Sequence, residues 1–228
     1  MWILEQRAFQ DRASTNHDSQ LDETVKQSKI GLDKPRIESL SDIVFGLALA
    51  ISTFPLISRL PAKPFGILID VAEFGFSFLI LIYVWLGYTK IMSVLPVEDS
   101  TTVTLNIALL FLVSIEPYLF YLNITFDLLT HEAFLNLASI LYALDMTGLM
   151  LILALFTNQL AKEERGLLPK ESLARYRRVR NILFISSALF AITILPAFWT
   201  FKVWNQSIRF YFWFTPLILS ALTRISDR

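Results

Sequence analysis

The stretch that decides the fold covers residues 36–55 and reads Arg-Ile-Glu-Ser-Leu-Ser-Asp-Ile-Val-Phe-Gly-Leu-Ala-Leu-Ala-Ile-Ser-Thr-Phe-Pro. It starts with charged and polar residues and then becomes apolar, so that Asp42 is the only ionisable residue between positions 40 and 57. At about 1.5 Å per residue, this segment nearly crosses a hydrocarbon core of about 30 Å. Its small residues, such as Gly46 and Ala48, let a neighbouring backbone approach closely. The stretch therefore predicts a membrane helix that faces protein or a pore as well as lipid.

The composition indicates the same class of protein. Apolar residues make up 54% of the chain and include 19 Phe, whereas the 18% of charged residues gather in a few loops. A net charge of zero argues against a nucleic-acid binder, which needs a basic surplus to neutralise phosphates. The absence of Cys excludes disulfides, thiolate nucleophiles and Cys-ligated metals.

Apolar segments recur along the rest of the chain. The pattern predicts an all-α integral membrane protein with six transmembrane helices, at about residues 40–57, 65–89, 101–123, 133–156, 181–201 and 207–222. We expect Tyr83, Trp85 and Tyr88 to lie at the headgroup boundary. Pro169 precedes a segment that could open a short helix leading into the fifth span. The predicted domains are a cytoplasmic N-terminal tail (1–35), a six-helix transmembrane domain (36–223) and a short cytoplasmic C-terminus (224–228).

Six spans place both termini on one side of the membrane, and the cations indicate which side. Sixteen of the 20 Lys and Arg then lie with the termini, while the opposite loops hold only four: Arg59, Lys63, Lys202 and Arg209. Because cytoplasmic loops carry the excess of Lys and Arg, both termini are predicted to be cytoplasmic.

A motif opens the first span. Arg36-x-x-x-Leu40-Ser41-Asp42, followed by an aliphatic and small-residue helix, resembles the Arg-x-x-x-Phe-Ser-Asp signature of the transmembrane protein 175 family, the endolysosomal potassium channel and its single-repeat prokaryotic relatives. The resemblance covers the first helix residue by residue, and the rest only through length and six-span layout. It implies a homotetrameric channel whose pore is lined by the first helix of each subunit. Consistent with this, the sequence has no Thr-Val-Gly-Tyr-Gly filter segment.

The same resemblance implies which residues line the pore. The family's hydrophobic constriction, five residues after the motif aspartate, falls on Leu47. On the same helix face, Ala50 or Ile51 and then Phe54 would follow Leu47, and Val44 or Ile43 would lie one turn before it. A dry collar of this kind favours potassium, which gives up water at lower cost than sodium. A Thr common in the family is Ala50 here, and Ser52 or Thr53 would have to face the axis to replace it.

The residues of the motif also have a simpler interpretation. Ser41 and Asp42 could cap the helix, and Arg36 could be a cytoplasmic anchor. The resemblance instead implies a network in which Arg36, Ser41 and Asp42 bond to polar groups of neighbouring helices and fix the pore helix. The apolar face around Leu47 could equally contact lipid or core, so that its assignment to a pore rests on the resemblance.

Acids inside the spans suggest a second hypothesis. Asp145 lies near the middle of the fourth span and Glu116 in the third, where an isolated carboxylate costs at least a few kcal/mol. Asp145 could be a proton or ion site. Alternatively, it could be a neutral hydrogen-bonded acid, or a carboxylate paired with a cation such as Arg36.

The sequence therefore predicts a passive cation channel with potassium as a permeant ion, with a hydrophobic constriction on the first helix and with no cofactor and no metal site. The alternative is a proton-linked carrier or proton leak that uses Asp145 and Glu116. His17 and His131 are isolated, and no nucleophile with a base and orienting acid is found, so no enzyme is predicted. The expected partners are further copies of the chain and membrane lipid, not nucleic acid. The expected location is a prokaryotic plasma membrane.

Overall fold

A computed structural model describes residues 34–58, 64–95, 100–126, 132–162, 169–203, 206–216 and 218–219. The chain divides into two units, Met1–Ile37 and Glu38–Arg228, and the helix packing below is that of the second unit. Apart from residues 34 and 35, the predicted N-terminal tail lies outside the described residues, as do the predicted C-terminus and both His residues.

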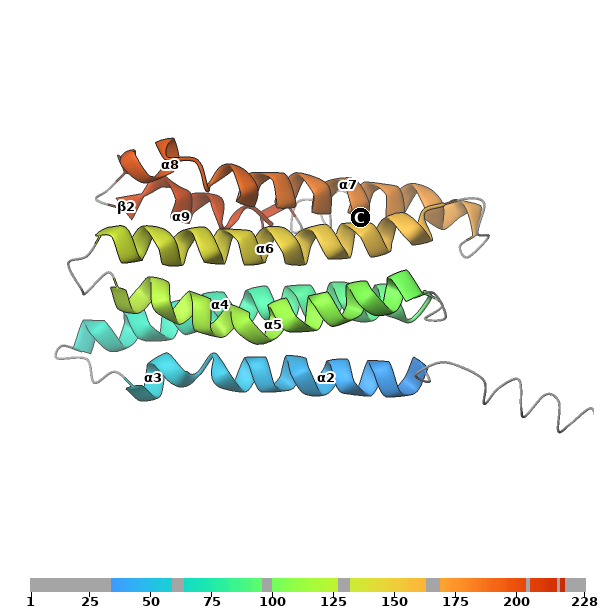
Figure 1. Ribbon diagram of the computed structural model, residues 1–228, viewed down its shortest axis with the longest axis horizontal. Coiled ribbons are helices and arrows are strands. Elements are labelled where there is room, and N and C mark those ends of the chain that lie inside the picture. Colours follow the sequence, from blue (N-terminus) through green and yellow to red (C-terminus); the bar gives the residue numbers. More distant parts are fainter. Residues whose placement is uncertain are drawn as a thin grey trace, which may run out of the picture. The chain divides into compact units, whose positions relative to one another are not determined.

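The described elements are almost all helical, which confirms the predicted all-α class (Figure 1). In chain order they are α2 (Lys34–Ile51), α3 (Phe54–Ser58), α4 (Pro64–Met92), α5 (Ser100–Phe126), α6 (Glu132–Leu160), α7 (Lys170–Ile192), α8 (Ala197–Thr200), β1 (Lys202–Val203), β2 (Gln206–Ser207) and α9 (Ile208–Phe212). The two short strands pair antiparallel, with Lys202 opposite Ser207.

Within the described residues, three helices are long and apolar enough to cross a membrane: Pro64–Met92, Ser100–Asn123 and Ala133–Leu160. They coincide with the second, third and fourth predicted spans. The first, fifth and sixth spans stay predictions. Helix α2 begins with charged and polar residues, the first half of α7 is basic, and only α9 and a few following residues of the sixth span are described.

Two of the predicted spans are interrupted, which the sequence analysis did not expect. The first helix ends at Ile51, and α3 restarts at Phe54 after a turn at Ser52 and Thr53. Likewise α7 ends at Ile192, four residues before Pro196. In both cases a proline four residues on, Pro55 or Pro196, has no N–H to donate to the last helical carbonyl. The backbone therefore closes tighter turns and starts a new short helix.

The chain between the fourth and fifth predicted spans is helical after Pro169. Helix α7 begins directly after Pro169, as the sequence suggested, but it continues unbroken into the fifth predicted span. Arg175, Arg178 and Arg180 are therefore held on a helix and not on a loop.

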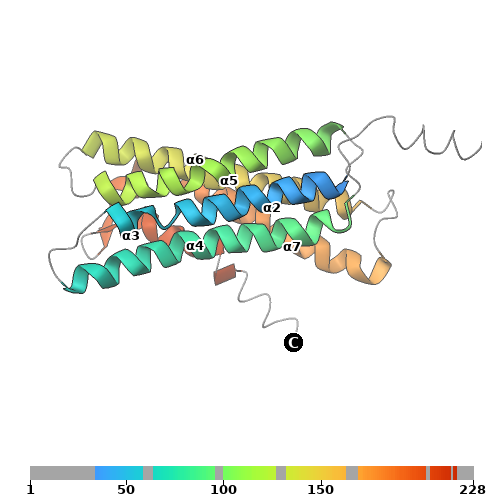
Figure 2. The same cartoon turned by 90° about the horizontal axis from the view of Figure 1, so that it is seen from below.

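Helix α6 lies at the centre of the second unit. It packs against α5 and α4 on one side and against α7 on the other, as Figures 1 and 2 show from two directions. A Cβ added at Gly148 of α6 would lie 2.7 Å from Leu112 Cδ1 of α5, so the two helices approach closely there. Helix α2 lies at the edge of the unit, beside α4.

Candidate functional site

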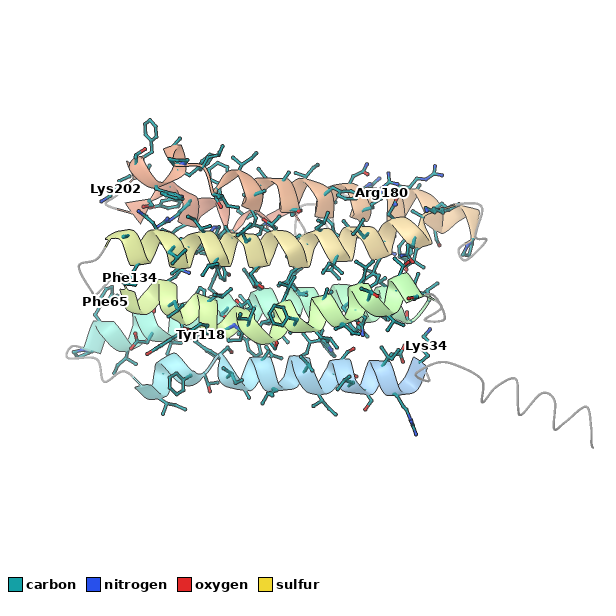
Figure 3. The ribbon with its side chains drawn as sticks, viewed as in Figure 1. Lys34, Phe65, Tyr118, Phe134, Arg180 and Lys202 are labelled. Atoms are coloured by element: carbon teal, nitrogen blue, oxygen red, sulfur yellow. The ribbon has the colours of Figure 1, made fainter. Side chains whose placement is uncertain are left out.

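One face of α2, continued by Phe54 of α3, is apolar and largely exposed in the single chain. Leu40, Ile43, Leu47, Ile51 and Phe54 recur every three or four residues, and each has a largely exposed side chain. Leu47 retains 59% of its surface. Ala50 is exposed as well, whereas Val44 is half-buried. We call Leu40, Ile43, Leu47, Ala50, Ile51 and Phe54 the α2 stripe, although Phe54 is the first residue of α3 and its ring packs edge-on against Tyr121 of α5, 5.6 Å between centroids. Figure 3 shows that some side chains of α2 point away from the other helices.

The opposite face of α2 is fixed to α4. Ser41, Phe45 and Ala48 are buried there. The Phe45 ring lies 5.7 Å, centroid to centroid, from the ring of Tyr88. Because one face packs on α4 and the other is bare, the rotation of α2 about its own axis is defined in the subunit.

Two residues of the motif bond to α4. The Ser41 hydroxyl lies 2.7 Å from the Tyr88 hydroxyl in a buried hydrogen bond. Trp85 Nε1 donates to Asp42 Oδ1 at 3.0 Å in an exposed one. Arg36 lies in the first turn of α2 but belongs to the unit Met1–Ile37, so its bonds to neighbouring helices stay a prediction.

The partners of the motif were missed by the sequence analysis. Tyr88 and Trp85 were expected at the headgroup boundary, yet Tyr88 is buried and bonded to α2. Their spacing of three residues puts both on one helix face, a signal that fits an interface with α2 as well as an aromatic belt. The sequence offered no way to choose between the two.

The hydroxyls beside Ala50 do not replace the missing threonine in this subunit. Ser52 is buried, and its Oγ donates to the Leu49 carbonyl at 2.7 Å. Thr53 Oγ1 donates to the carbonyl of Ala50 at 2.6 Å. Both protons are used at the helix break, and the stripe at Ala50 presents only a methyl group.

The two acids lie in the helix core, away from the α2 stripe. Glu116 of α5 is fully buried, and the Ser77 hydroxyl lies 3.2 Å from each of its carboxylate oxygens. Asp145 of α6 keeps only 3% of its surface, and neither of its oxygens has a hydrogen-bond partner among the described residues. The two acids are close enough to interact electrostatically, next to Tyr142.

No group of three or more His, Asp or Glu within the described ranges could hold a metal ion.

Comparisons with known proteins agree with the motif. Residues 36–117, which include the α2 stripe, α4 and most of α5, match the family model of the endosomal/lysosomal potassium channel TMEM175. The fold resembles the crystal structure of a lysosomal potassium-selective channel TMEM175 homolog from Chamaesiphon minutus, with a TM-score of 0.58 and 20% sequence identity. That match covers 84% of this chain and 97% of the other. No curated protein sequence matches.

Proposed function

We propose that the chain is a passive cation channel, permeable to potassium, in which copies of α2 surround the pore, because residues 36–117 match the TMEM175 family model and the fold resembles that of a TMEM175 homolog. The structural relative is described as a potassium-selective channel. The observation that carries the pore assignment is the α2 stripe, which is apolar, regularly spaced and largely exposed in one subunit.

The position and exposure of Leu47 on the α2 stripe suit a hydrophobic constriction. Leu47 lies near the middle of α2 and is 59% exposed, so that copies related by rotation can bring its side chain to a common axis. An ion passing a ring of leucines must shed part of its water shell, which costs potassium less than sodium. Val44 lies one turn below Leu47, and Ala50, Ile51 and Phe54 continue the lining above it.

Several copies are required, because one helix cannot enclose a pore. Soluble and membrane oligomers of identical chains close by rotational symmetry, and we propose a homotetramer. The network of Ser41 and Asp42 with α4 then sets the direction in which each α2 presents its stripe. Opening requires the helices to rotate or move apart at Leu47.

The lining limits how selectivity can arise. Ala50 offers no hydroxyl, and the Ser52 and Thr53 hydroxyls donate to their own backbone. Selectivity in this chain therefore depends on dehydration at the apolar ring more than on coordination by side-chain oxygens. We also propose a prokaryotic plasma membrane as the location, with cytoplasmic termini, from the single six-span unit and the distribution of cations.

The test is potassium flux through the purified protein in liposomes, with Leu47→Asn as the variant. A smaller, polar side chain at the constriction should raise the flux and reduce the preference for potassium over sodium. Ile107→Asn is the matched control, since Ile107 of α5 is 62% exposed but lies outside the stripe. If both variants behave like the parent protein, Leu47 does not form the constriction.

The second candidate, a proton-linked carrier or proton leak, is favoured by Asp145. This buried carboxyl has no hydrogen-bond partner among the described residues and lies in the central helix with Glu116 nearby. Potassium flux that does not depend on a proton gradient, and that persists in Asp145→Asn, would exclude the carrier. Proton flux that is lost in Asp145→Asn while the protein stays folded would support it.

A further inference from the structure

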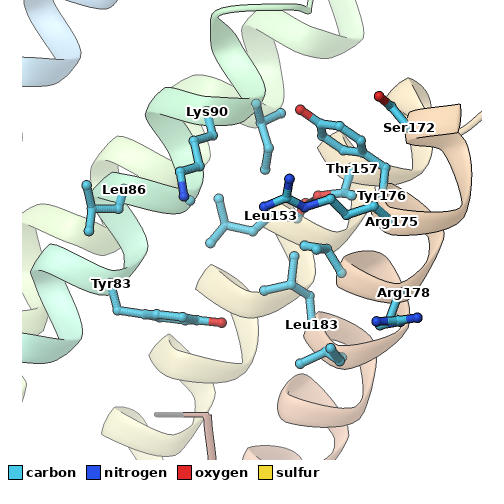
Figure 4. A pocket seen from close by; sticks show the side chains of 14 residues that line it. Tyr83, Leu86, Lys90, Leu153, Thr157, Ser172, Arg175, Tyr176, Arg178 and Leu183 are labelled. Atoms are coloured by element: carbon cyan, nitrogen blue, oxygen red, sulfur yellow. Dashed lines mark hydrogen bonds between the residues drawn. The ribbon is translucent and has the colours of Figure 1, made fainter. Parts of the chain in front are cut away.

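A cavity of about 450 Å³ lies between α4, α6 and α7, away from the α2 stripe. Its volume is within the range of about 300–1,000 Å³ that small-molecule sites occupy. Figure 4 shows Lys90 and Arg175 projecting into this space from α4 and α7, with Tyr83, Leu153 and Leu183 around it.

The polar part of the cavity is cationic. Lys90, Arg175 and Arg178 line it, and none of its lining residues is Asp or Glu. No described residue forms an ion pair with Lys90 or Arg175. Cations gathered from two helices repel one another, and an anion placed between them relieves the repulsion. Arginine also binds phosphate through two parallel hydrogen bonds.

Hydroxyl groups and a helix end add to the preference for an anion. Tyr83, Tyr176 and Ser172 line the cavity together with the cations. Ser172 lies in the first turn of α7, where the N-terminal cap makes no side-chain hydrogen bond and the backbone amides carry partial positive charge.

The other part of the cavity is apolar. Leu86 of α4, Leu153 of α6, and Val179 and Leu183 of α7 form this wall. Leu86 and Val179 are exposed, so the wall continues onto the outer surface of the helices. Lys90 lies in the last turn of a helix long enough to cross the membrane, which places the cations at the level of the headgroups.

We propose that this cavity binds an anionic phospholipid, with its phosphate between Lys90 and Arg175 and an acyl chain along the wall of Leu86, Leu153 and Val179. Basic pockets between transmembrane helices recognise anionic headgroups in this way. A free phosphate would use the cations but not the apolar wall, and a neutral lipid would use the wall but not the cations. The site is separate from the proposed pore, so a regulatory lipid could bind there without entering it.

The experiment is native mass spectrometry of the detergent-purified protein with phosphatidylglycerol as the probe. Each cation near a membrane surface contributes about 1 kcal/mol, so Arg175→Gln and Lys90→Gln should each lower the affinity about fivefold, and the double variant about 25-fold. Arg177→Gln is the matched control, because Arg177 is on the same helix, is exposed and does not line the cavity. Phosphatidylcholine and inorganic phosphate are the comparison ligands.

The outcomes separate the sources of the anion. Preference for phosphatidylglycerol over phosphatidylcholine, lost in Arg175→Gln and kept in Arg177→Gln, supports the site. Equal loss in Arg177→Gln would show general attraction to a basic helix and overturn the proposal. Displacement of the lipid by inorganic phosphate at similar concentration would overturn the acyl-chain contact. Arg175 is exposed, so the thermal midpoint of Arg175→Gln should equal that of the parent, and lipid binding is read without any channel activity.

Discussion

The hydroxyl oxygens of Ser41 and Tyr88 lie 2.7 Å apart in a buried hydrogen bond that joins α2 to α4. Ser41 lies six residues before Leu47, the proposed constriction. A bond in this position fixes the helix face that α2 turns away from its own subunit. The channel assembly that we propose depends on that face.

Tyr88→Phe tests this bond. The variant keeps the ring against Phe45 but removes the hydrogen bond to Ser41, which should cost about 0.5–1.5 kcal/mol of unfolding free energy. Ser41→Ala combined with Tyr88→Phe should cost less than the two single changes together. Trp85→Phe is the control, because its bond to Asp42 is exposed and should be worth less. Thermal unfolding in detergent measures the stability of each variant. If the loss of stability in the double variant equals the sum of the losses in the two single variants, Ser41 and Tyr88 do not interact.

A substitution at Gly46 tests whether α2 contacts other copies of the chain near the α2 stripe. An added Cβ at Gly46 has nothing within 4 Å in one subunit, and the same is true of Gly75 in α4. Gly46→Leu should therefore leave the subunit folded but reduce the fraction of oligomer, since small residues permit close helix approach. Gly75→Leu should assemble normally. The measurement is the mass of the oligomer that each variant forms in detergent. Unchanged assembly of Gly46→Leu would show that this part of α2 faces lipid.

Ala50 tests how the pore distinguishes ions. Ala50→Thr adds a hydroxyl to the stripe and should raise the permeability of potassium relative to sodium. Ala50→Val is the matched control, because valine has nearly the same shape without the oxygen. Reversal potentials under mixed-ion conditions measure the ratio. A larger ratio in both variants would point to pore width and not to coordination.

Pro55 tests the break between α2 and α3. Pro55→Ala restores an amide that can bond to the carbonyl of Ile51 and removes a penalty of about 3 kcal/mol for a continuous helix. Because Phe54 lies at the break and belongs to the stripe, single-channel conductance should change. Pro196→Ala makes the same change after α7, outside the stripe, and should leave conductance unaltered. If Pro55→Ala and Pro196→Ala have the same conductance, the break between α2 and α3 does not influence permeation.

Asn123 tests the contact between α5 and α6. Its Nδ2 donates to the carbonyls of Leu119 at 2.9 Å and Ala138 at 3.2 Å, and Ser139 Oγ donates to its Oδ1. Asn123→Leu removes these bonds and leaves the buried Ser139 hydroxyl without its acceptor, so it should lower the unfolding free energy by about 1–3 kcal/mol. Asn158→Leu, at a half-buried site that accepts one bond from Arg180, should cost less, as measured by chemical denaturation.

The sequence by itself determined the class of the protein and the membrane helices of its middle part. Apolar length is dictated by the thickness of the hydrocarbon, and a chain in lipid must satisfy its backbone within helices. The segments at α4, α5 and α6 could therefore be found from hydropathy, and the motif at Arg36, Ser41 and Asp42 was enough to indicate the family. The prolines near the ends of α2 and α7 are also present in the sequence, but a long apolar run by itself predicts one continuous helix and not a helix that breaks before the proline.

Only the tertiary structure decided which side of α2 is covered. In a membrane protein both the lipid-facing and the protein-facing sides of a helix are apolar, so hydropathy does not distinguish Phe45, which packs on Tyr88, from Leu47, which is bare. Nor could it show that Lys90 and Arg175, far apart in the chain, line one cavity. These relationships arise from how helices pack against one another, and that packing depends on residues distant in the sequence.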